Sequence, residues 1–341
     1  MKTTVRMTFT LTVLTVIALR AQAAPQVDLQ FRPTPADKQT VRVTSNLSMS
    51  RPIDSRQSEI MNTRTITLAI EPGETTADGT VPARVRFVAI QVRSGTKGRK
   101  LSVDYDSTQP PDEREPFALA YSASIGASFP IKVSPQGEIV DIGMDELWLA
   151  VADNYIEQIE ALMRQRLGDQ ADQAIEEMFK PFGSREKRIQ VTREQLDPLW
   201  DKSRIRALLA NILVRLPQKP VSEGETWRAP VAFDISMPFE INADYVLKSE
   251  ENGHCTIAVD GKRSSQDDPI VTHTGPARIN MKPAGFCTGT VTVDAKTGLL
   301  LSGQTQFEFT GEIQAFDSAS QTQAETVQFA MKGTTTVEIV K

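Results

Sequence analysis

Apolar and polar residues alternate over many short segments of this chain, which is typical of strands that bury one face of a sheet. The first segment has Val41, Val43, Leu47 and Met49 on one face and Arg42, Thr44, Asn46 and Ser48 on the other. Further strands are expected at residues 65–70, 83–92, 100–105 and 129–133, with turn residues such as Pro72-Gly73 and Asp78-Gly79 between them. Short strands joined by turns favour an antiparallel sheet.

The period changes near residue 145, where apolar residues recur every three or four positions. This stripe predicts an amphipathic helix that continues past Gly168 to Phe179, and its members are Trp148, Val151, Tyr155, Ile159 and Leu162. A shorter helix is predicted over residues 116–125, ending at Gly126. Thr192 with Gln195 three residues later is typical of a capping box, and an apolar stripe follows from Ile205 to Leu216.

The strand pattern returns after Pro230 and includes a strong hairpin signal, Asn252-Gly253, between two alternating segments. We therefore predict an α+β fold in which a curved antiparallel sheet, or two of them, packs on a central group of amphipathic helices. The predicted single domain spans residues 24–341, with strands over 40–140, a helical middle over 144–216 and strands over 231–340. One sheet assembled from both ends and two sheets wrapped around the helices both fit this pattern.

The first 23 residues have the three parts of a secretory signal peptide. Lys2 and Arg6 form a basic start, an uncharged apolar run covers residues 8–19, and Ala21-Gln22-Ala23 precedes the expected cleavage point. A run of 12 residues is too short to span a membrane, which takes about 20. The expected location is periplasmic or secreted after cleavage near Ala23. No Cys follows the leader before Cys255, so a soluble mature protein without a lipid anchor, and without a transmembrane segment, is expected.

Composition makes a nucleic-acid partner a poor expectation. The chain carries 38 Lys and Arg residues against 43 Asp and Glu residues. Removal of the leader, with its three basic residues, makes the mature chain more acidic still, whereas nucleic-acid binding depends on basic surfaces. The basic clusters at residues 93–100 and 185–188 are short and contain no interleaved aromatic residues, so solvated loops are expected there.

All four His and Cys residues lie close together in sequence, at His254, Cys255, His273 and Cys287. Structural zinc sites usually pair ligands two to four residues apart, whereas the adjacent His254 and Cys255 would face opposite sides of a strand. No metal and no cofactor are therefore expected. In an oxidising compartment, a disulfide between Cys255 and Cys287 is the better interpretation.

Ser184 with Lys187, and Lys296-Thr297-Gly298, match two of the three motifs of penicillin-recognising serine enzymes. That chemistry needs the Ser at a helix start, but residues 183–191 resemble a loop followed by a strand. The Lys296 motif lies in a turn, and the third motif, S-x-N, is absent from the sequence. The GxSxG and HExxH motifs are absent as well, so no catalytic residue is assigned and a non-enzymatic protein is expected.

A distinctive segment runs from Leu216 to Trp227 and fits the pattern LPxxPVxxGxTW. Its defining residues are Leu216, Pro217, Pro220, Val221, Gly224 and Trp227. In this segment, and in shorter pieces such as Ser134-Pro135-Gln136-Gly137, the chain resembles an uncharacterised family of exported bacterial proteins, a domain of unknown function. The resemblance implies an exported location and this fold class, and it names no reaction. By itself the segment predicts an architectural role, with Trp227 filling the gap between helix and sheet; the alternative role for Trp227 is ligand stacking.

Two functions from different classes fit these observations. The first is a non-catalytic binding protein that holds a hydrophobic small molecule between sheet and helices. The second is a structural or interaction module of the cell envelope, meeting a protein partner through a strand edge or the polar loop at residues 318–326. A hydrolase with an unrecognised site is a third, weaker hypothesis. A cavity between helices and sheet would favour the first function and a filled interior the second, while the oligomeric state stays open.

Overall fold

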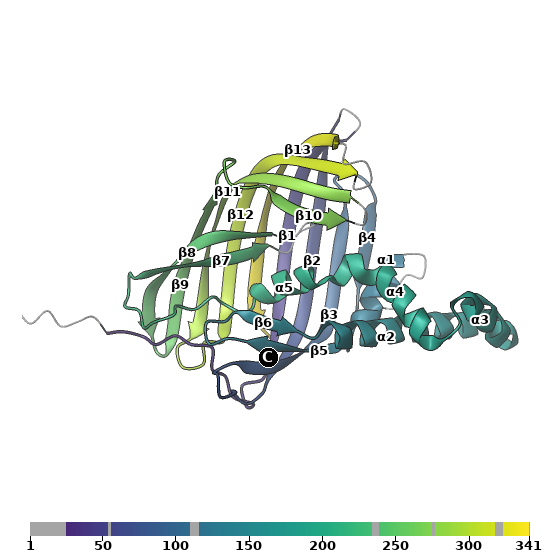
Figure 1. Cartoon of the computed structure of the whole chain (residues 1–341), viewed down its shortest axis with the longest axis horizontal. Coiled ribbons are helices and arrows are strands. Elements are labelled where there is room, and N and C mark those ends of the chain that lie inside the picture. Colours follow the sequence, from purple (N-terminus) through teal and green to yellow (C-terminus); the bar gives the residue numbers. More distant parts are fainter. Residues whose placement is uncertain are drawn as a thin grey trace, which may run out of the picture.

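In the part of the chain that the structure describes, one curved antiparallel sheet of 13 strands and five α-helices from the middle of the sequence make up the fold (Figure 1). We describe it from a computed structural model, which covers residues 25–53, 56–109, 116–233, 239–274, 277–317 and 323–340. Along the sheet the strands follow the order β6-β5-β3-β2-β1-β13-β12-β11-β9-β8-β7, while β4 pairs with β3 and β10 with β11. The α+β prediction is thus confirmed.

The strands come from both ends of the chain. The first group is β1 (Gln39–Ile53), β2 (Arg56–Pro72), β3 (Val81–Thr96), β4 (Leu101–Asp106), β5 (Ser128–Val133) and β6 (Ile139–Ile142). The second is β7 (Thr226–Phe233), β8 (Phe239–Glu251), β9 (His254–Arg263), β10 (Ile270–Thr274), β11 (Ala277–Asp294), β12 (Leu300–Asp317) and β13 (Gln323–Ile339). Antiparallel pairing of β1 with β13 joins the two groups, so the described strands form one sheet and not two.

The helices are α1 (Pro116–Ser124), α2 (Met144–Leu167), α3 (Ala171–Phe179), α4 (Arg185–Trp200) and α5 (Lys202–Ala210). The helix predicted to run to Phe179 is interrupted at Gly168, whose φ of 52° is left-handed and ends α2. The predicted capping box at Thr192 is wrong, because Thr192 lies inside α4. The N-cap is Ser184, whose Oγ accepts a hydrogen bond from the Lys187 amide at 3.4 Å.

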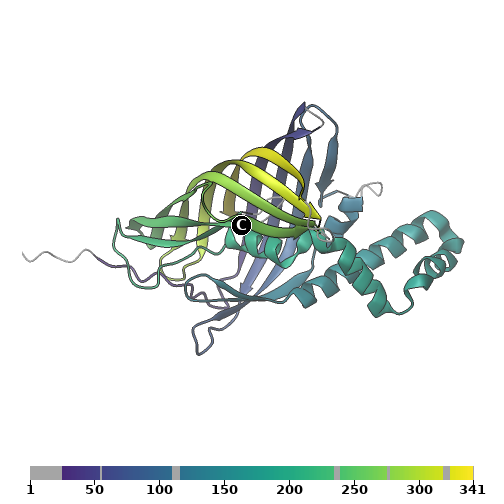
Figure 2. The same ribbon diagram turned by 45° about the horizontal axis from the view of Figure 1, so that its top comes forward.

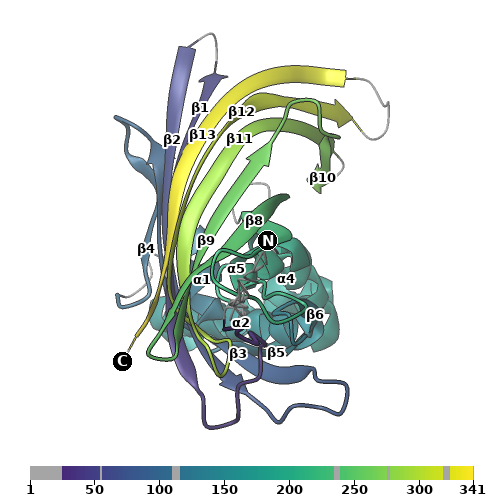
Figure 3. The same ribbon diagram turned by 90° about the vertical axis from the view of Figure 1, so that its left-hand side faces the viewer.

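The sheet curves into a half-pipe whose concave face holds helices (Figure 3). Helices α2, α3 and α4 form an arm that extends beyond the sheet (Figure 2). The main core lies between the concave face and the helices and is made of buried side chains from both, for example Val43, Ile66 and Ile90 on strands and Trp148, Leu208 and Leu209 on helices. A smaller cluster of Ile156, Ala171, Ile175 and Phe179 stabilises the arm.

The hairpin signal at Asn252-Gly253 is confirmed as the turn between β8 and β9. Asn252 has a φ of 54° and Gly253 a φ of 79°, and a type I′ turn requires positive φ at both central positions. The Asn252-Gly253 pair therefore has the local conformation that this turn needs, and the Ala295 amide also donates a hydrogen bond to the Gly253 carbonyl at 2.8 Å.

The predicted disulfide is wrong: Cys255 and Cys287 are both free and buried. They lie on the paired strands β9 and β11, but Cys287 pairs in register with Gly261, and Cys255 pairs with Val293. Cys255 and Gly261 are thus six positions apart along β9, about 20 Å at the strand rise of roughly 3.3 Å per residue. A disulfide needs Cα atoms within about 7 Å, so the register keeps these thiols apart.

The predicted signal peptide lies outside the described residues. None of the helices in the described ranges is long and apolar enough to cross a membrane.

Candidate functional site

A row of small and polar side chains crosses the otherwise apolar concave face. In-register pairing places one residue from each of five neighbouring strands side by side, and these residues are Gly289, Thr305, Thr335, Ser45 and Arg64. We name this set the polar row. On β1 the positions two residues before and after Ser45 are the apolar Val43 and Leu47, whereas on β2 Arg64 is followed by the buried Ile66 and preceded by the polar Asn62. Within the row, the Ser45 and Thr335 hydroxyls lie 3.3 Å apart and share a hydrogen bond.

A cavity of about 160 Å³ opens over one end of the polar row. Its sheet wall comes from β1, β2, β3, β7, β12 and β13, and helices α1 and α5 contribute Tyr121 and Arg204. The lining residues are Ser45, Asn46, Leu47, Asn62, Arg64, Val92, Tyr121, Arg204, Phe233, Phe307 and Thr335. The side chains of Ser45 and Thr335 are short, which helps to leave a space between the sheet and the helices at this point.

The cavity wall carries two guanidinium groups. Arg64 comes from the sheet and Arg204 from α5, where Arg204 also forms an ion pair with the helix N-cap Asp201 at 3.4 Å. Burial, with the like charge of Arg204 as a lesser cause, lowers the pKa of Arg64 from 12.5 to about 10. Burial also raises the pKa of the Tyr121 hydroxyl, against the opposing influence of both arginines, so Tyr121 stays a neutral donor at physiological pH.

Another part of the cavity lining is apolar and aromatic. Phe233 and Phe307 have ring centroids 5.1 Å apart in an edge-to-face arrangement. They belong to a second buried cluster, here the aromatic cluster, made of Met49, Phe233, Phe239, Ile241, Met281, Cys287, Phe307, Phe309, Phe329 and Met331. The cavity lining therefore combines two cationic side chains with apolar and aromatic ones.

A second, smaller cavity of about 40 Å³ lies beside the first, and Thr335 lines both. Its wall includes Thr305 of the polar row, together with Ala210 and Asn211 at the end of α5. The polar row thus underlies two adjoining spaces between sheet and helices.

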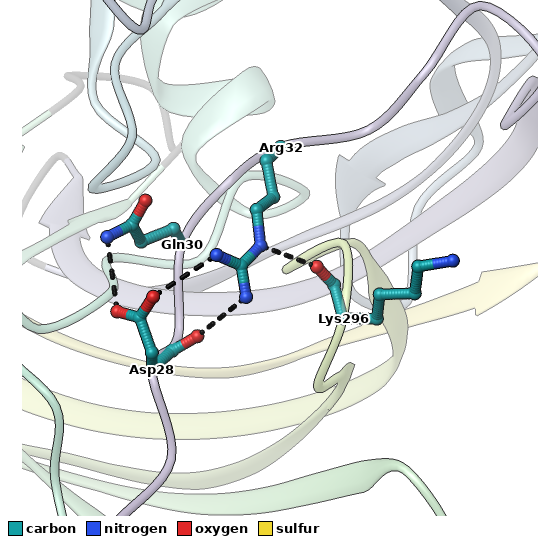
Figure 4. Close-up of polar contacts among 4 residues, drawn as sticks. All are labelled: Asp28, Gln30, Arg32 and Lys296. Atoms are coloured by element: carbon teal, nitrogen blue, oxygen red, sulfur yellow. Dashed lines mark hydrogen bonds and ion pairs between the residues drawn. The ribbon is translucent and has the colours of Figure 1, made fainter.

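The N-terminal segment 27–32 contacts two loops that are distant in the sequence, one near Val221 and one at Lys296. Its Val27 forms a bridge with Val221 of the LPxxPVxxGxTW segment, and Leu29 and Phe31 are buried in the main core. Figure 4 shows Arg32, which donates from Nε to the Lys296 carbonyl at 2.9 Å and pairs with Asp28 at 3.1 Å. The Lys296 motif is thus a structural turn between β11 and β12, as its position in the sequence predicted.

The LPxxPVxxGxTW segment connects α5 to β7. The Trp227 ring stacks on Tyr245 with centroids 5.7 Å apart, and its Nε1 donates to the Arg215 carbonyl at 2.9 Å. Leu216 and Val221 are buried in the main core, and Gly224 has a left-handed φ of 82°. These contacts support the architectural role of the segment. An open groove nevertheless runs along the segment, and its lining includes Pro217, Val221 and Trp227.

The remaining candidates from the sequence do not come together as a site. His254 pairs in register with Asp294, while His273 lies on β10 opposite Arg278. No group of three or more His, Cys, Asp or Glu side chains in the described ranges has the geometry of a metal site. Ser184 does begin a helix with Lys187 one turn later, contrary to the loop expected there, but its Oγ serves as the cap of α4.

The polar row was not predicted from the sequence, although a signal for it exists. Ser45 occupies an apolar-phase position between Val43 and Leu47, and Arg64 occupies one two residues before the buried Ile66. Polar residues that interrupt an apolar face are informative because burial of a polar group has a cost. What the sequence could not give is that these interruptions are neighbours in space.

Comparisons with known proteins place the chain in a family. No curated protein sequence matches it significantly. Lipovitellin, in a structure reported for its lipid–protein interactions, is 8% identical with a TM-score of 0.45, over 89% of this chain and 25% of that one. OpdQ of Pseudomonas aeruginosa is 8% identical with a TM-score of 0.16, over 87% and 63%. This chain thus spans a quarter of the lipovitellin chain. Residues 78–180 and 169–300 match the sequence model described as "Family of unknown function (DUF6263)", and the chain belongs to that family.

Proposed function

We propose that this protein is a non-catalytic binding protein that holds a ligand with an apolar part between the concave face of the sheet and helices α1 and α5. The observation that carries the proposal is the cavity of about 160 Å³ over the polar row. Core packing normally leaves few spaces larger than a water molecule, so a space of this size bounded by aromatic side chains is a candidate ligand site.

The size of the cavity limits what it holds. An engineered protein cavity of about 150 Å³ accommodates a molecule the size of benzene. The cavity therefore suits a small ligand, or one end of a larger amphiphile whose remainder extends out of the cavity. A complete lipid does not fit within it.

Ligand binding can be tested with matched tryptophan variants on one strand. Thr335 lines the cavity, whereas its neighbour Thr336 faces the opposite side of β13 and is exposed. Thr335→Trp is expected to fill the cavity and abolish binding of a fluorescent apolar probe, and Thr336→Trp to leave it unchanged. Native mass spectrometry of the wild-type protein, purified from cells under conditions that preserve lipid complexes, should show added mass. Bare polypeptide mass together with equal probe binding by both variants would refute the proposal.

Export from the cytoplasm is part of the same proposal, and its support is the leader pattern of residues 1–23. N-terminal sequencing of the protein from the periplasmic or culture fraction should give a chain that begins at Ala24. Full-length protein confined to the cytoplasm would contradict this.

An interaction module is the second candidate function. The observation that favours it is a groove of about 580 Å³ on the outer face of the sheet, bordered by Met61 and Phe286, which are 47% and 40% exposed. Crosslinking in intact cells distinguishes the two functions, because an interaction module should give a stable protein adduct that Phe286→Ser removes. The loop expected at residues 318–326 lies largely outside the described residues.

A further inference from the structure

We propose that the ligand is an anionic amphiphile whose carboxylate or phosphate head group binds between Arg64 of β2 and Arg204 of α5, with its first carbons against Phe233 and Phe307. This inference rests on the proposed binding function and names the chemical class of the ligand. It follows from which side chains share the 160 Å³ cavity.

The cavity lining is rich in hydrogen-bond donors. Two guanidinium groups line one small space, and each presents several N–H groups in a planar fork that matches an oxyanion. The neutral side chains of Asn62, Tyr121 and Thr335 on the same wall can donate further hydrogen bonds. No carboxylate is among the described residues that line the cavity. The lining set therefore suits an anion and disfavours a cation.

A second feature is the charge on Arg64. Burial and the charge of Arg204 both disfavour the protonated form of Arg64, which is why its pKa lies at about 10. An oxyanion between the two arginines would reverse both effects, because it attracts each guanidinium in a medium of lower dielectric constant than water. Anion binding should thus raise the pKa of Arg64.

The cavity lining also has an apolar part. Its members are Leu47, Val92, Phe233 and Phe307, and a free inorganic anion would make no use of these side chains. Phe233 and Phe307 also belong to the buried aromatic cluster, so the first carbons of a ligand would contact the border of a larger apolar region. An amphiphile uses both the cationic and the apolar side chains, whereas a purely apolar or a purely ionic ligand uses one kind.

Calorimetric titration with four probes of related shape tests the inference: decanoate, decyl phosphate, 1-decanol and inorganic phosphate. Wild-type protein should bind decanoate or decyl phosphate at least tenfold more tightly than 1-decanol. Arg64→Gln and Arg204→Gln should each lower the affinity for the anionic probe by about 10- to 100-fold, the range expected for loss of a charge-assisted hydrogen bond. Arg64→Lys should retain part of the affinity, because it keeps the charge without the fork.

The matched control is Arg93→Gln. This arginine is on the neighbouring strand β3, its side chain is 66% exposed, and it pairs with Asp104 on the surface. The Arg93→Gln substitution removes one positive charge outside the cavity and should leave the affinity for the anionic probe unchanged. A thermal melt of each variant establishes that it is folded.

Each outcome has one meaning. If none of the three decyl probes binds, both the proposed function and this inference fail. If 1-decanol binds as tightly as decanoate, and the Arg64 and Arg204 variants are without effect, the inference fails while the binding function stands. If inorganic phosphate competes as well as decyl phosphate, the site is one for small anions and the amphiphile is refuted. Loss of affinity in Arg93→Gln equal to that in Arg64→Gln would show a general charge effect and would also refute it.

Discussion

Trp227 offers the sharpest test of the segment that connects helix α5 to the sheet. Its ring stacks on Tyr245 at 5.7 Å, and its Nε1 donates to the Arg215 carbonyl at 2.9 Å, so one side chain links strands β7 and β8 to the loop after α5. The side chain is half-buried. Two substitutions separate these contributions: Trp227→Phe keeps an aromatic ring and removes the donor, and Trp227→Ala removes both.

The magnitude follows from the contacts. Loss of the hydrogen bond alone should lower the free energy of unfolding by about 1 kcal/mol. The aromatic pair contributes about 1 kcal/mol more. Burial of roughly half of a side chain of this size, at about 25 cal/mol per Å², contributes about 2 to 3 kcal/mol. We therefore expect a loss of about 1 to 2 kcal/mol for Trp227→Phe and about 4 kcal/mol for Trp227→Ala.

Urea unfolding followed by far-ultraviolet circular dichroism measures both variants without relying on tryptophan fluorescence. The control is Thr226→Ala, since Thr226 is the exposed neighbour on the same strand and should change stability by less than about 0.5 kcal/mol. A loss below about 1 kcal/mol for Trp227→Ala would refute the architectural role. Unchanged stability combined with lost probe binding would favour the ligand-stacking alternative instead.

Three further predictions concern buried thiols, a turn and pH. Cys255 and Cys287 should both be free thiols, and burial raises the pKa of each to about 11. The native thiols should therefore react with a disulfide reagent at pH 8 about a hundredfold more slowly than the thiols of the unfolded protein. Failure to titrate two thiols after unfolding would contradict this prediction. Gly137→Ala should destabilise by about 2 kcal/mol or more in thermal or urea unfolding, because Gly137 has a φ of 72° and a Cβ there would clash with the Val214 carbonyl oxygen. The control is Gly98→Ala, because Gly98 has a φ of 77° but open space around a Cβ, so only the backbone conformation costs stability there, about 1 kcal/mol. Equal losses of stability in the two variants would refute the steric explanation. Since the thiols hold their protons more tightly in the native state, their contribution to stability is constant below pH 9 and is lost as the pH rises toward 11. The wild type should therefore lose more stability between pH 9 and 11 than the double variant Cys255→Ala/Cys287→Ala. Equal losses would show that the thiols are not the cause.

Local features of the sequence anticipated much of the fold. The alternating residues of β1 and the Asn252-Gly253 turn were sufficient, because the side-chain period and the turn conformation depend on adjacent residues. Local signals failed where two of them competed. Thr192 has the spacing of a capping box, but Ser184 lies earlier, caps the helix, and leaves Thr192 buried inside α4.

The disulfide prediction failed because proximity in sequence does not fix register. Cys255 and Cys287 do lie on paired strands, yet the pairing of Cys287 with Gly261 separates them along the strand direction. Register is set by the hydrophobic pattern over the whole pair and by the intervening connections, neither of which two isolated residues reveal.

Local period and composition were enough to predict the fold class, most element positions and the acidic character of the chain. The sequence also shows Ser45 and Arg64 as polar residues within apolar strand faces. That these residues form a row, and that the row underlies a cavity, depends on the three-dimensional fold. Ser45 meets Thr335 across 290 positions of sequence, and Arg204 reaches the same cavity from a helix in the middle of the chain. Such neighbours follow from the pairing of β1 with β13 and from helix packing, which are long-range interactions that no local pattern encodes.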